Sequence, residues 1–170
     1  MDEITQEVVH RLFDYSEQTG ELTHKTQAAR RINMGDVAGH LHSTGYVTVA
    51  IKGKAYKAHK LVWLWQTGKY PKHDVDHING NRSDNRWSNL RKATRGQNCA
   101  NRTTPVKSAA GYKGVVSRGN SHSARIRTPG KVHHLGSFPT PEAAAQAYDK
   151  AAIKLHGEFA RTNKSLGLLG

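Results

Sequence analysis

The stretch that organises this chain is residues 75–98, which read VDHINGNRSDNRWSNLRKATRGQN. It sets a carboxylate beside an imidazole at Asp76 and His77, and it supplies two amides farther along, at Asn89 and Asn98. A carboxylate, an imidazole and spaced amides are the side chains that a metal-dependent hydrolase of phosphodiesters needs. The stretch is therefore the first candidate for a catalytic site.

The local pattern around these side chains predicts a compact strand–loop–strand–helix unit. A short strand ends near Ile78, a second short strand lies near Leu90, and a helix begins around Thr94. Between the strands, Asn79-Gly80 is the dipeptide that most favours a tight type I′ turn, in which both central residues have positive φ. The helix would carry Asn98 on its first turns.

Each polar side chain suits one chemical role. The oxygens of Asp76 and Asn98 are hard ligands that Mg²⁺ accepts, and two protein ligands leave room for water and phosphate. His77, neutral near pH 7, can take a proton from an attacking water. Asn89 can hold that imidazole in one tautomer through its side-chain carbonyl. The cation would stabilise charge on the scissile phosphate.

The same stretch resembles the HNH (ββα-metal) endonucleases, in particular the phage and intron-associated, homing-type group with the motif D-H-x-x-G-N-x-x-D-N-x-x-x-N-L-R…N. The resemblance implies that Asp76 and Asn98 bind the metal, that His77 is the base and that Asn89 orients it. In this group the last motif position is Asn, so Asn98 is no departure. The matching positions are Asp76, His77, Gly80, Asn81, Asp84, Asn85, Asn89, Leu90, Arg91 and Asn98.

A plainer interpretation competes with this one. An Asp-His pair at a strand end is commonly solvated surface, and Asn-rich loops are commonly turns; the spacing of Asn89 and Asn98 favours the site instead. Strict strand alternation would also send Asp76 and His77 to opposite faces. For both to serve one site, the strand end must twist or bulge, or the metal must lie beside the strand edge.

Charge indicates a polyanionic partner. The 170-residue chain has a formal net charge of +13, which concentrates nucleic acid around it. Residues 85–141 contain no Asp or Glu, and so long a run is better explained as a path that follows phosphates than as a solvated face. The basic residues in this run are Arg86, Arg91, Lys92, Arg95, Arg102, Lys107, Lys113, Arg118, Arg125, Arg127 and Lys131.

Other classes of protein are disfavoured. No apolar stretch approaches the roughly 20 residues of a membrane span, and the acidic N-terminus lacks a secretory signal. Cys99 is the single cysteine, so we expect neither a disulfide framework nor structural zinc. We expect a cytoplasmic protein, in the cytoplasm of the host cell if a phage encodes it.

The residues before the motif predict supporting elements. A short helix is expected over 4–15, a strand over 21–23, a β-hairpin over 45–58 and an apolar helix over 59–66. The basic loop at 25–36 fits either DNA contact or simple solvation. His59 is the second residue of a segment, A-H-K-L-V-W, that also recurs in the family that the motif resembles. His59 is therefore expected either to pack in the core or to lie near the site, and Arg91 is expected near the site as well.

After the motif, residues 99–110 are small, polar and basic, which predicts a linker. The pattern then predicts three strands, over 111–116, 123–128 and 132–138, and a helix from Thr140 to about His156. In the second of these strands Arg125 and Arg127 share one face. A three-stranded sheet covered by one helix leaves its other face open, and such a face can enter the major groove of DNA.

This second half resembles the AP2/ERF DNA-binding domain, through Y-K-G-V (112–115), A-R-I-R (124–127), H-L-G-S-F (134–138) and the helix region 142–163. His134 stands where the plant domains usually have Trp, and Arg125 where many have Glu, so the plant base preference is not carried over. The residues that the resemblance would turn toward DNA are Lys113, Arg118, Arg125, Arg127 and His134.

Together these patterns predict an α+β protein of two parts. An HNH nuclease domain (1–98, motif 75–98), with a β-hairpin and a short helix before its ββα-metal unit, is joined by the basic linker 99–110 to an AP2-like domain (111–163) and a tail (164–170). We expect Mg²⁺- or Mn²⁺-dependent cleavage of double-stranded DNA, nicking by a monomer or weak dimer, and no small-molecule cofactor. The alternatives are a DNA-binding regulator with a relic nuclease unit and, less favoured, cleavage of RNA.

Overall fold

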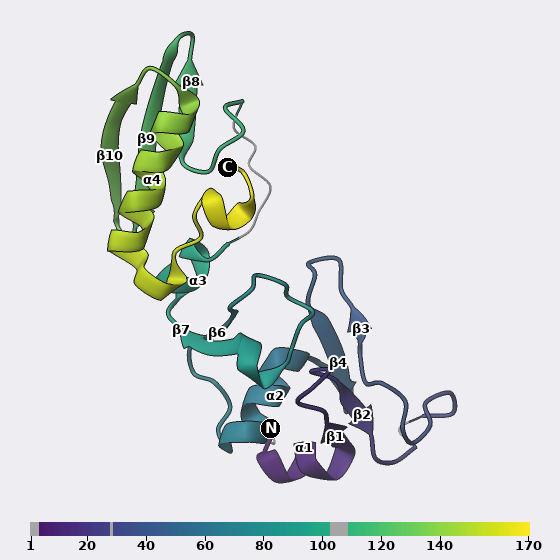
Figure 1. Cartoon of the computed structure of the whole chain (residues 1–170). Coiled ribbons are helices and arrows are strands. Elements are labelled where there is room, and N and C mark those ends of the chain that lie inside the picture. Colours follow the sequence, from purple (N-terminus) through teal and green to yellow (C-terminus); the bar gives the residue numbers. More distant parts are fainter. Residues whose placement is uncertain (1–3, 28, 103–108) are drawn as a thin grey trace. The chain divides into compact units, whose positions relative to one another are not determined.

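The computed structural model describes residues 4–27, 29–102 and 109–170. The chain divides into two compact units, Met1–Ala93 and Thr94–Gly170. Both units combine helices with small antiparallel sheets, which confirms the predicted α+β class (Figure 1). None of the helices in the described ranges has the length and apolar character that a membrane span needs.

Short elements build the first unit. β1 pairs with β2. A three-stranded sheet consists of β3, β4 and β5, and β6 pairs with β7. The predicted hairpin is therefore present and gains β3 as a third strand. In chain order the elements are α1 (Gln6–Leu12), β1 (Phe13–Tyr15), β2 (Leu22–His24), β3 (His40–Leu41), β4 (Val47–Ile51), β5 (Lys54–Lys57), α2 (Ala58–Thr67), β6 (Asp74–His77), the 3-10 helix η1 (Trp87–Asn89) and β7 (Leu90–Ala93).

The N-terminal helix is shorter than the sequence predicted. Thr5 caps α1 by accepting a hydrogen bond from the backbone of Val8, but the helix ends at Leu12 rather than at residue 15. Phe13 is buried and pairs with His24 as part of β1. The helical pattern was wrong over these last three residues because pairing with β2 and burial in the core outweigh helix propensity.

The predicted type I′ turn at Asn79-Gly80 was also wrong. Only Gly80 has positive φ there, and the backbone N–H of Gly80 donates to the carbonyl of His77, so this glycine is the fourth residue of its turn. A fourth-position glycine is typical of type I turns. Positive φ at both central residues occurs instead at Lys52-Gly53, between β4 and β5, where a two-residue hairpin requires it.

The core of the first unit surrounds α2. Leu61, Val62 and Leu64 of this helix are buried, and the β6–β7 hairpin packs on the same core through Val75 and Leu90. Trp63 is partly buried, with its ring centroid 5.1 Å from that of Trp87. The candidate catalytic hairpin is thus attached to the body of the unit by its own apolar residues.

The second unit has a three-stranded sheet, in the order β10-β9-β8, and the predicted helix α4 (Figure 1). The first of these strands was predicted over 111–116, but residues 111–114 form bends and turns, and the strand begins at Val115. Residues 103–108, which include half of the predicted linker and Lys107, lie outside the described residues. The elements are α3 (Arg95–Ala100), β8 (Val115–Arg118), β9 (Ser121–Thr128), β10 (Lys131–Phe138), α4 (Pro141–His156), η2 (Gly157–Phe159) and η3 (Lys164–Leu166).

Small side chains let α4 lie close to the sheet. Ala144 and Ala145 are fully buried against Val115 and Ala124 of the strands. The helix begins as the sequence predicted, with Thr140 as N-cap and a proline in the first turn. This close packing covers one face of the sheet and leaves the other face open.

The chain after α4 folds back onto the second unit. Asn163 is 0% exposed; its backbone and side-chain N–H groups donate to the Asp149 carboxylate, at 2.7 and 2.9 Å. The side-chain amide of Asn163 also bonds the backbone of Lys113: it accepts from the N–H of Lys113 at 2.6 Å and donates to the carbonyl of Lys113 at 3.2 Å. Residues 164–170, predicted as a tail, contain η3, and Leu169 packs against the core.

The hydrogen bonds of Asn163 give a prediction for the stability of the protein. We expect Asn163→Ala to lower the free energy of unfolding by about 1–3 kcal/mol, because the Asp149 carboxylate would lose one of its hydrogen bonds and the backbone N–H and carbonyl of Lys113 would lose the amide that they bond. Denaturant unfolding would measure the change. Asn120→Ala, at an exposed position before β9, is the control and should change the free energy by less than about 0.5 kcal/mol. Equal stability of the two variants would contradict the prediction.

Candidate active site

The β6–β7 hairpin positions the two central side chains of the motif. The pairing is regular: Asp76 lies opposite Arg91, and His77 lies opposite Leu90. Both Asp76 and His77 are only 4% exposed. Because the register has no shift, the two side chains leave the strand on opposite sides. Of the arrangements considered from the sequence, this regular register excludes a bulge at the strand end.

Asp76 forms an ion pair with Arg91. The Nε and one terminal nitrogen of the guanidinium each lie 3.0 Å from Oδ2 of the carboxylate. Both side chains are largely withdrawn from solvent, and the hydrogen bond from Nε of Arg91 orients the carboxylate within this ion pair. Arg91, expected near the site, thus touches the candidate metal ligand directly.

His77 is oriented by an amide that the sequence reasoning gave no role. Its Nε2 lies 3.1 Å from Oδ1 of Asn85, which is itself buried. An amide oxygen only accepts hydrogen bonds, so Nε2 carries the proton and the lone pair of the neutral ring is on Nδ1. Burial lowers the pKa of His77, against the opposing effects of the Asn85 hydrogen bond and the Asp76 charge. The imidazole is therefore neutral near pH 7, as a base must be.

His59, from the start of α2, lies against the candidate base. Its ring is edge-on to that of His77, with centroids 4.9 Å apart, and Tyr46 contacts it at 5.2 Å. His59 is 3% exposed, and burial, followed by the proximity of His77, lowers the pKa of His59 to about 2. The two possibilities raised from the sequence are thus compatible, because this neutral residue both packs in the core and touches the ring of His77.

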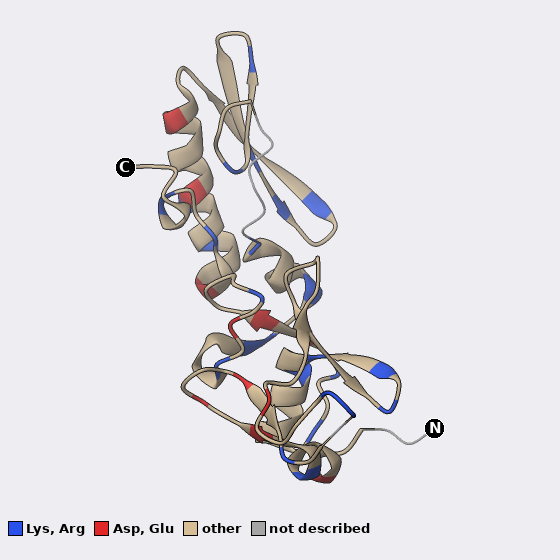
Figure 2. Cartoon of the chain, turned by 90° about the vertical axis from the view of Figure 1, so that its right-hand side faces the viewer, with Lys and Arg blue, Asp and Glu red and all other residues tan. Residues whose placement is uncertain are grey.

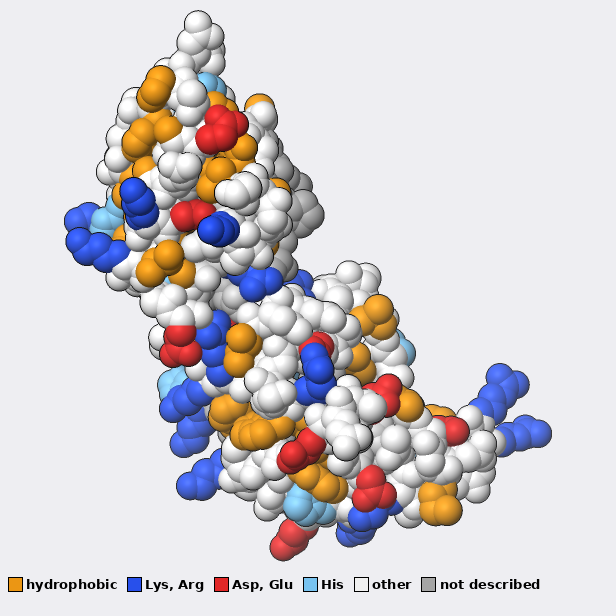
Figure 3. All heavy atoms as spheres, viewed as in Figure 1, with side chains coloured by type: hydrophobic (Ala, Val, Ile, Leu, Met, Phe, Trp, Pro, Cys, Tyr) orange, Lys and Arg blue, Asp and Glu red, His pale blue; other side chains and the backbone are white. Residues whose placement is uncertain are grey.

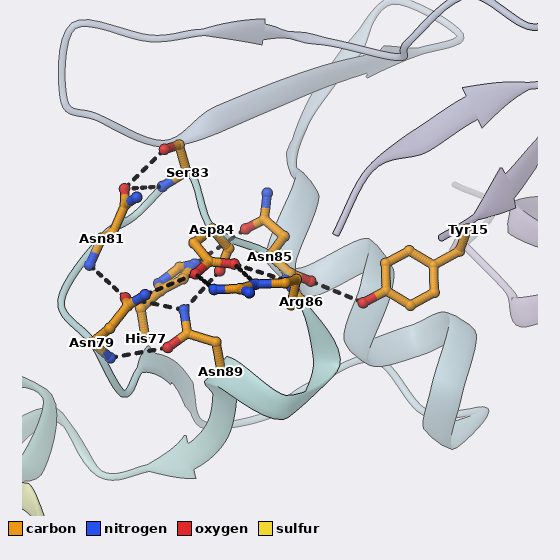
Figure 4. Close-up of polar contacts among 9 residues, drawn as sticks. All are labelled: Tyr15, His77, Asn79, Asn81, Ser83, Asp84, Asn85, Arg86 and Asn89. Atoms are coloured by element: carbon orange, nitrogen blue, oxygen red, sulfur yellow. Dashed lines mark hydrogen bonds and ion pairs between the residues drawn. The ribbon is translucent and has the colours of Figure 1, made fainter. Parts of the chain in front are cut away.

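Asn89 ties together the loop that carries Asn85 (Figure 4). It accepts from the backbone N–H of Asn79 at 2.9 Å, and its amide donates to the Asn79 side chain at 3.1 Å and to the carbonyl of Asp84 at 2.8 Å. The contact with the His77 ring that we expected of Asn89 is made by Asn85, the neighbour of Asp84. The hydroxyl of Tyr15, on β1, also donates to the carbonyl of Asn85 in this loop, at 3.0 Å.

Asp84 closes the same loop electrostatically. Its carboxylate accepts from Nε of Arg86 at 2.8 Å, from a terminal guanidinium nitrogen at 2.6 Å and from the Asn79 amide at 2.7 Å (Figure 4). Chiefly through the Arg86 hydrogen bond, the pKa of Asp84 falls from 3.8 to about 2. Asp84 and Asn85 both belong to the motif and could be recognised in the sequence. Their residue types alone did not show that Asn85 contacts the His77 ring and that Asp84 bonds within the loop.

The other candidate metal ligand, Asn98, belongs to the second unit. It lies on α3, whose N-cap is Thr94, where the sequence predicted the start of the helix; Thr94 and Gln97 cap the helix reciprocally. The boundary between the compact units falls at Ala93, before α3, whereas the sequence placed the end of the nuclease domain at residue 98. The structure therefore gathers Asp76, His77 and Asn89 in one unit and describes Asn98 with the other.

The open face of the second sheet is basic. Ala124 and Ile126 of β9 are buried beneath α4, whereas Arg125 and Arg127 are exposed on the opposite face, as the alternation predicted. His134 of β10 is exposed and pairs with Arg125, and Arg118 at the end of β8 is exposed as well. In this unit Figure 2 marks acidic positions on α4 and in the segment just after it, and none on the three strands. Figure 3 shows basic side chains projecting beside the edge where β10 lies.

Lys113 is placed differently from these four residues. It is partly buried, and its Nζ donates to the carbonyls of Ala100 and Arg102, at 3.0 and 3.2 Å. The other residues predicted to face DNA present their side chains to solvent, whereas this ammonium is turned to the end of α3. The sequence pattern Y-K-G-V could not reveal this contact, because the partner carbonyls lie more than ten residues away.

Comparison with known proteins supports the resemblance that the motif shows. A family model described as HNH endonuclease matches residues 56–100, from β5 through α3. An uncharacterized HNH endonuclease of Acanthamoeba polyphaga mimivirus is 38% identical over 129 residues, 74% of this chain and 66% of that protein. Protein 3.8 of Escherichia phage T7 is 34% identical over 111 residues, 64% of this chain and 91% of that protein. The chain belongs to the HNH endonuclease family.

This HNH endonuclease carries an AP2-like domain in its C-terminal part. An ethylene-responsive transcription factor of Arabidopsis thaliana is 48% identical over 56 residues, 31% of the chain and 30% of that factor. The chain thus spans about two thirds of the mimivirus protein and under a third of the plant factor. The resemblance predicted for both halves from their motifs is confirmed, and the matched family is one of endonucleases.

The low pKa of Asp84 gives a testable pH dependence of stability. A carboxylate whose pKa is depressed on folding stabilises the fold above its ordinary pKa, and this contribution disappears as the pH falls through the folded-state value. We therefore expect Asp84→Asn to destabilise the protein at neutral pH, with a deficit that shrinks as the pH falls from about 4 to about 2. Denaturant unfolding of both proteins across this range would measure the deficit.

Asp14→Asn is the matched control for this experiment. Asp14 also lies near a cation, 3.3 Å from Lys25, but its side chain is 66% exposed, and exposed pairs contribute little. A deficit for Asp84→Asn that stayed constant down to about pH 2 would show that its carboxylate charge is not what stabilises the loop.

Proposed function

We propose that this protein cleaves double-stranded DNA by hydrolysis that depends on a divalent cation, Mg²⁺ or Mn²⁺, with His77 as the general base. The observation that carries the proposal is a buried, neutral imidazole held by Asn85 on a hairpin that also carries the paired carboxylate of Asp76. A base must be neutral and fixed in orientation before it can take a proton from water.

In this proposal two amides of the polar loop orient His77, one by direct contact and one indirectly. Asn85 touches the ring and keeps the proton on Nε2, so Nδ1 is the atom that would accept a proton from water. Asn89 would orient the ring indirectly: its amide donates to the carbonyl of Asp84 and so holds the backbone next to Asn85. Both amides stay uncharged at every physiological pH, so neither changes its contact when the imidazole is protonated.

Asp76 and Asn98 are the proposed metal ligands. The carboxylate of Asp76 and the side-chain oxygen of Asn98 are hard oxygen ligands of the kind that Mg²⁺ takes. Arg91 would hold the carboxylate in place for that role. A bound cation would supply charge stabilisation at the scissile phosphate and its leaving oxygen.

The open sheet face of the second unit is the proposed DNA-binding surface. Arg125 and Arg127 stand on it beside His134, with Arg118 at the end of β8, and the three strands bear no acidic residue. A two- or three-stranded sheet fits the major groove, where arginine pairs with phosphates and guanine edges. Its role would be affinity and some preference for sequence.

Two further features complete the proposal. One nuclease site per chain cuts one strand for each binding event, so we propose nicking by a monomer or weak dimer of the homing type. Because relatives come from a virus and a phage, we propose that the enzyme acts in the cytoplasm of a host cell.

Cleavage of supercoiled plasmid tests the nuclease proposal. We expect relaxed circles with wild type and Mg²⁺, none with EDTA, and a rate for His77→Ala lower by about 10²–10⁴-fold, because removing a general base costs that much. His73→Ala, an exposed histidine four residues upstream, is the matched control and should cleave at the wild-type rate. Gel electrophoresis separates supercoiled, nicked and linear DNA.

The same experiment discriminates the rival function. If wild type bound duplex tightly but left the plasmid supercoiled with both Mg²⁺ and Mn²⁺, the chain would be a non-cutting DNA-binding regulator. Cleavage of a matched single-stranded RNA in place of the plasmid would favour the RNA-directed alternative.

Salt dependence of duplex binding tests the sheet face. We expect Arg125→Gln/Arg127→Gln to weaken binding and to reduce the slope of log affinity against log salt by about 1 for each phosphate that the protein no longer neutralises. Lys150→Gln/Lys154→Gln removes the same charge from exposed positions on α4 and should leave the slope nearly unchanged. Equal effects of the two pairs would show that only net charge matters.

A further inference from the structure

The helix α3 is too short to be stable by itself. It has six residues, none of them buried, although it carries Asn98 and the chain's single cysteine, Cys99. Isolated helices shorter than about 12–15 residues are marginal in water. Something outside the helix must therefore hold Asn98 in place.

The N-terminal end of α3 is closed locally. Thr94 accepts from the backbone N–H of Gln97 at 3.3 Å, and the Gln97 side chain accepts from the backbone N–H of Thr94 at 2.8 Å. This capping box satisfies two backbone donors, but it joins only neighbours in the sequence. It sets where the helix begins and does not attach it to the rest of the unit.

The C-terminal end is closed from the sheet domain. Nζ of Lys113, just before β8, donates to the carbonyls of Ala100 and Arg102. These carbonyls lie at the end of the helix, where backbone acceptors lack partners within it and a cation is favourable. Burial, and then the charge of Arg161, lower the pKa of Lys113 to about 8, so the ammonium persists at pH 7.

The backbone of Lys113 is itself fixed. Its N–H and carbonyl both bond the amide of Asn163, which the Asp149 carboxylate of α4 holds in turn. A chain of short contacts thus runs from the helix that covers the sheet, through Asn163 and Lys113, to the end of α3. A side chain anchored at its backbone is suited to positioning a neighbour.

A second contact fixes the other end of α3. A Cβ added to Gly96 would lie 2.8 Å from Cγ of Pro129, in the turn between β9 and β10. Such a separation is shorter than a van der Waals contact between carbons. The helix therefore lies against the sheet domain at its first turn as well as its last.

We propose that Lys113 is a positioning residue of the nuclease: it seats α3, and with it Asn98, on the AP2-like domain rather than contacting DNA. The inference rests on the proposed role of Asn98 as a metal ligand. Residues that hold a metal ligand in place typically change metal affinity 10–100-fold when they are removed, so the metal requirement of cleavage is the sensitive readout.

The first arm of the test measures the helix itself, without metal or DNA. A nitroxide on Cys99, which is exposed, reports the mobility of α3 by its EPR line shape. Lys113→Met keeps the length of the side chain and removes the ammonium, and we expect it to raise label mobility. Lys154→Met, an exposed lysine on α4, is the control and should leave the spectrum unchanged.

The second arm separates positioning from DNA contact. For Lys113→Met we expect duplex affinity in EDTA within about twofold of wild type, and a rise of about tenfold or more in the Mg²⁺ concentration that gives half-maximal cleavage. Lower affinity in EDTA, with an unchanged Mg²⁺ requirement and an unchanged EPR spectrum, would overturn the proposal and make Lys113 a DNA contact.

A variant without charge change covers the case in which Lys113→Met does not fold. Gly96→Ala should raise label mobility and Mg²⁺ requirement by the same route, and Pro129→Ala in the same chain should reverse both, because it removes the atom that the new methyl group meets. If Gly96→Ala changes neither readout, α3 is not seated by the sheet domain and the proposal fails.

The two arms also separate this inference from the proposed function. If wild type cleaves with no divalent metal, or does not cleave at all, the role given to Asn98 fails. The EPR arm then still decides whether Lys113 seats α3.

Discussion

The in-register pairing of β6 with β7 is the constraint on which the candidate site depends. It sets Asp76 against the guanidinium of Arg91, and it directs Val75 and Leu90 into the core beneath α2. A slip of one residue would exchange the two faces of the strand, so the carboxylate would lose its partner and the imidazole would leave Asn85. The apolar residues therefore fix the chemistry as well as the packing.

Neutral amides orient the His77 ring and the loop beside this hairpin. Asn85 holds the ring, while Asn79 and Asn89 bond each other through side chain and backbone. Amides donate and accept at once and carry no charge, so they can satisfy a buried polar loop without the desolvation cost that extra ionised groups would bring. The single strong charge pair described in the loop, Asp84 with Arg86, lies toward its solvent side.

The second unit illustrates how one small sheet can serve two purposes. On its covered face Val115, Ala124 and Ile126 pack against α4, whose buried alanines let the helix approach closely. Its open face bears arginines suited to phosphates. At the end of the same sheet, Lys113 and Pro129 meet α3, a helix that the HNH motif counts as its own. Family boundaries drawn in sequence and compact units drawn in space need not coincide.

The sequence by itself determined the family, the α+β class, the two-part organisation, and the start of α3 near Thr94, because caps, alternation and motif spacing are local properties. It also predicted which face of β9 carries Arg125 and Arg127. Only the tertiary structure decided that Asn85 rather than Asn89 touches His77, that α1 gives way to a strand at Phe13, and that Lys113 turns from solvent to the end of α3. These outcomes depend on partners distant in the chain or on competition between nearby amides of one type, and no local pattern ranks such contacts.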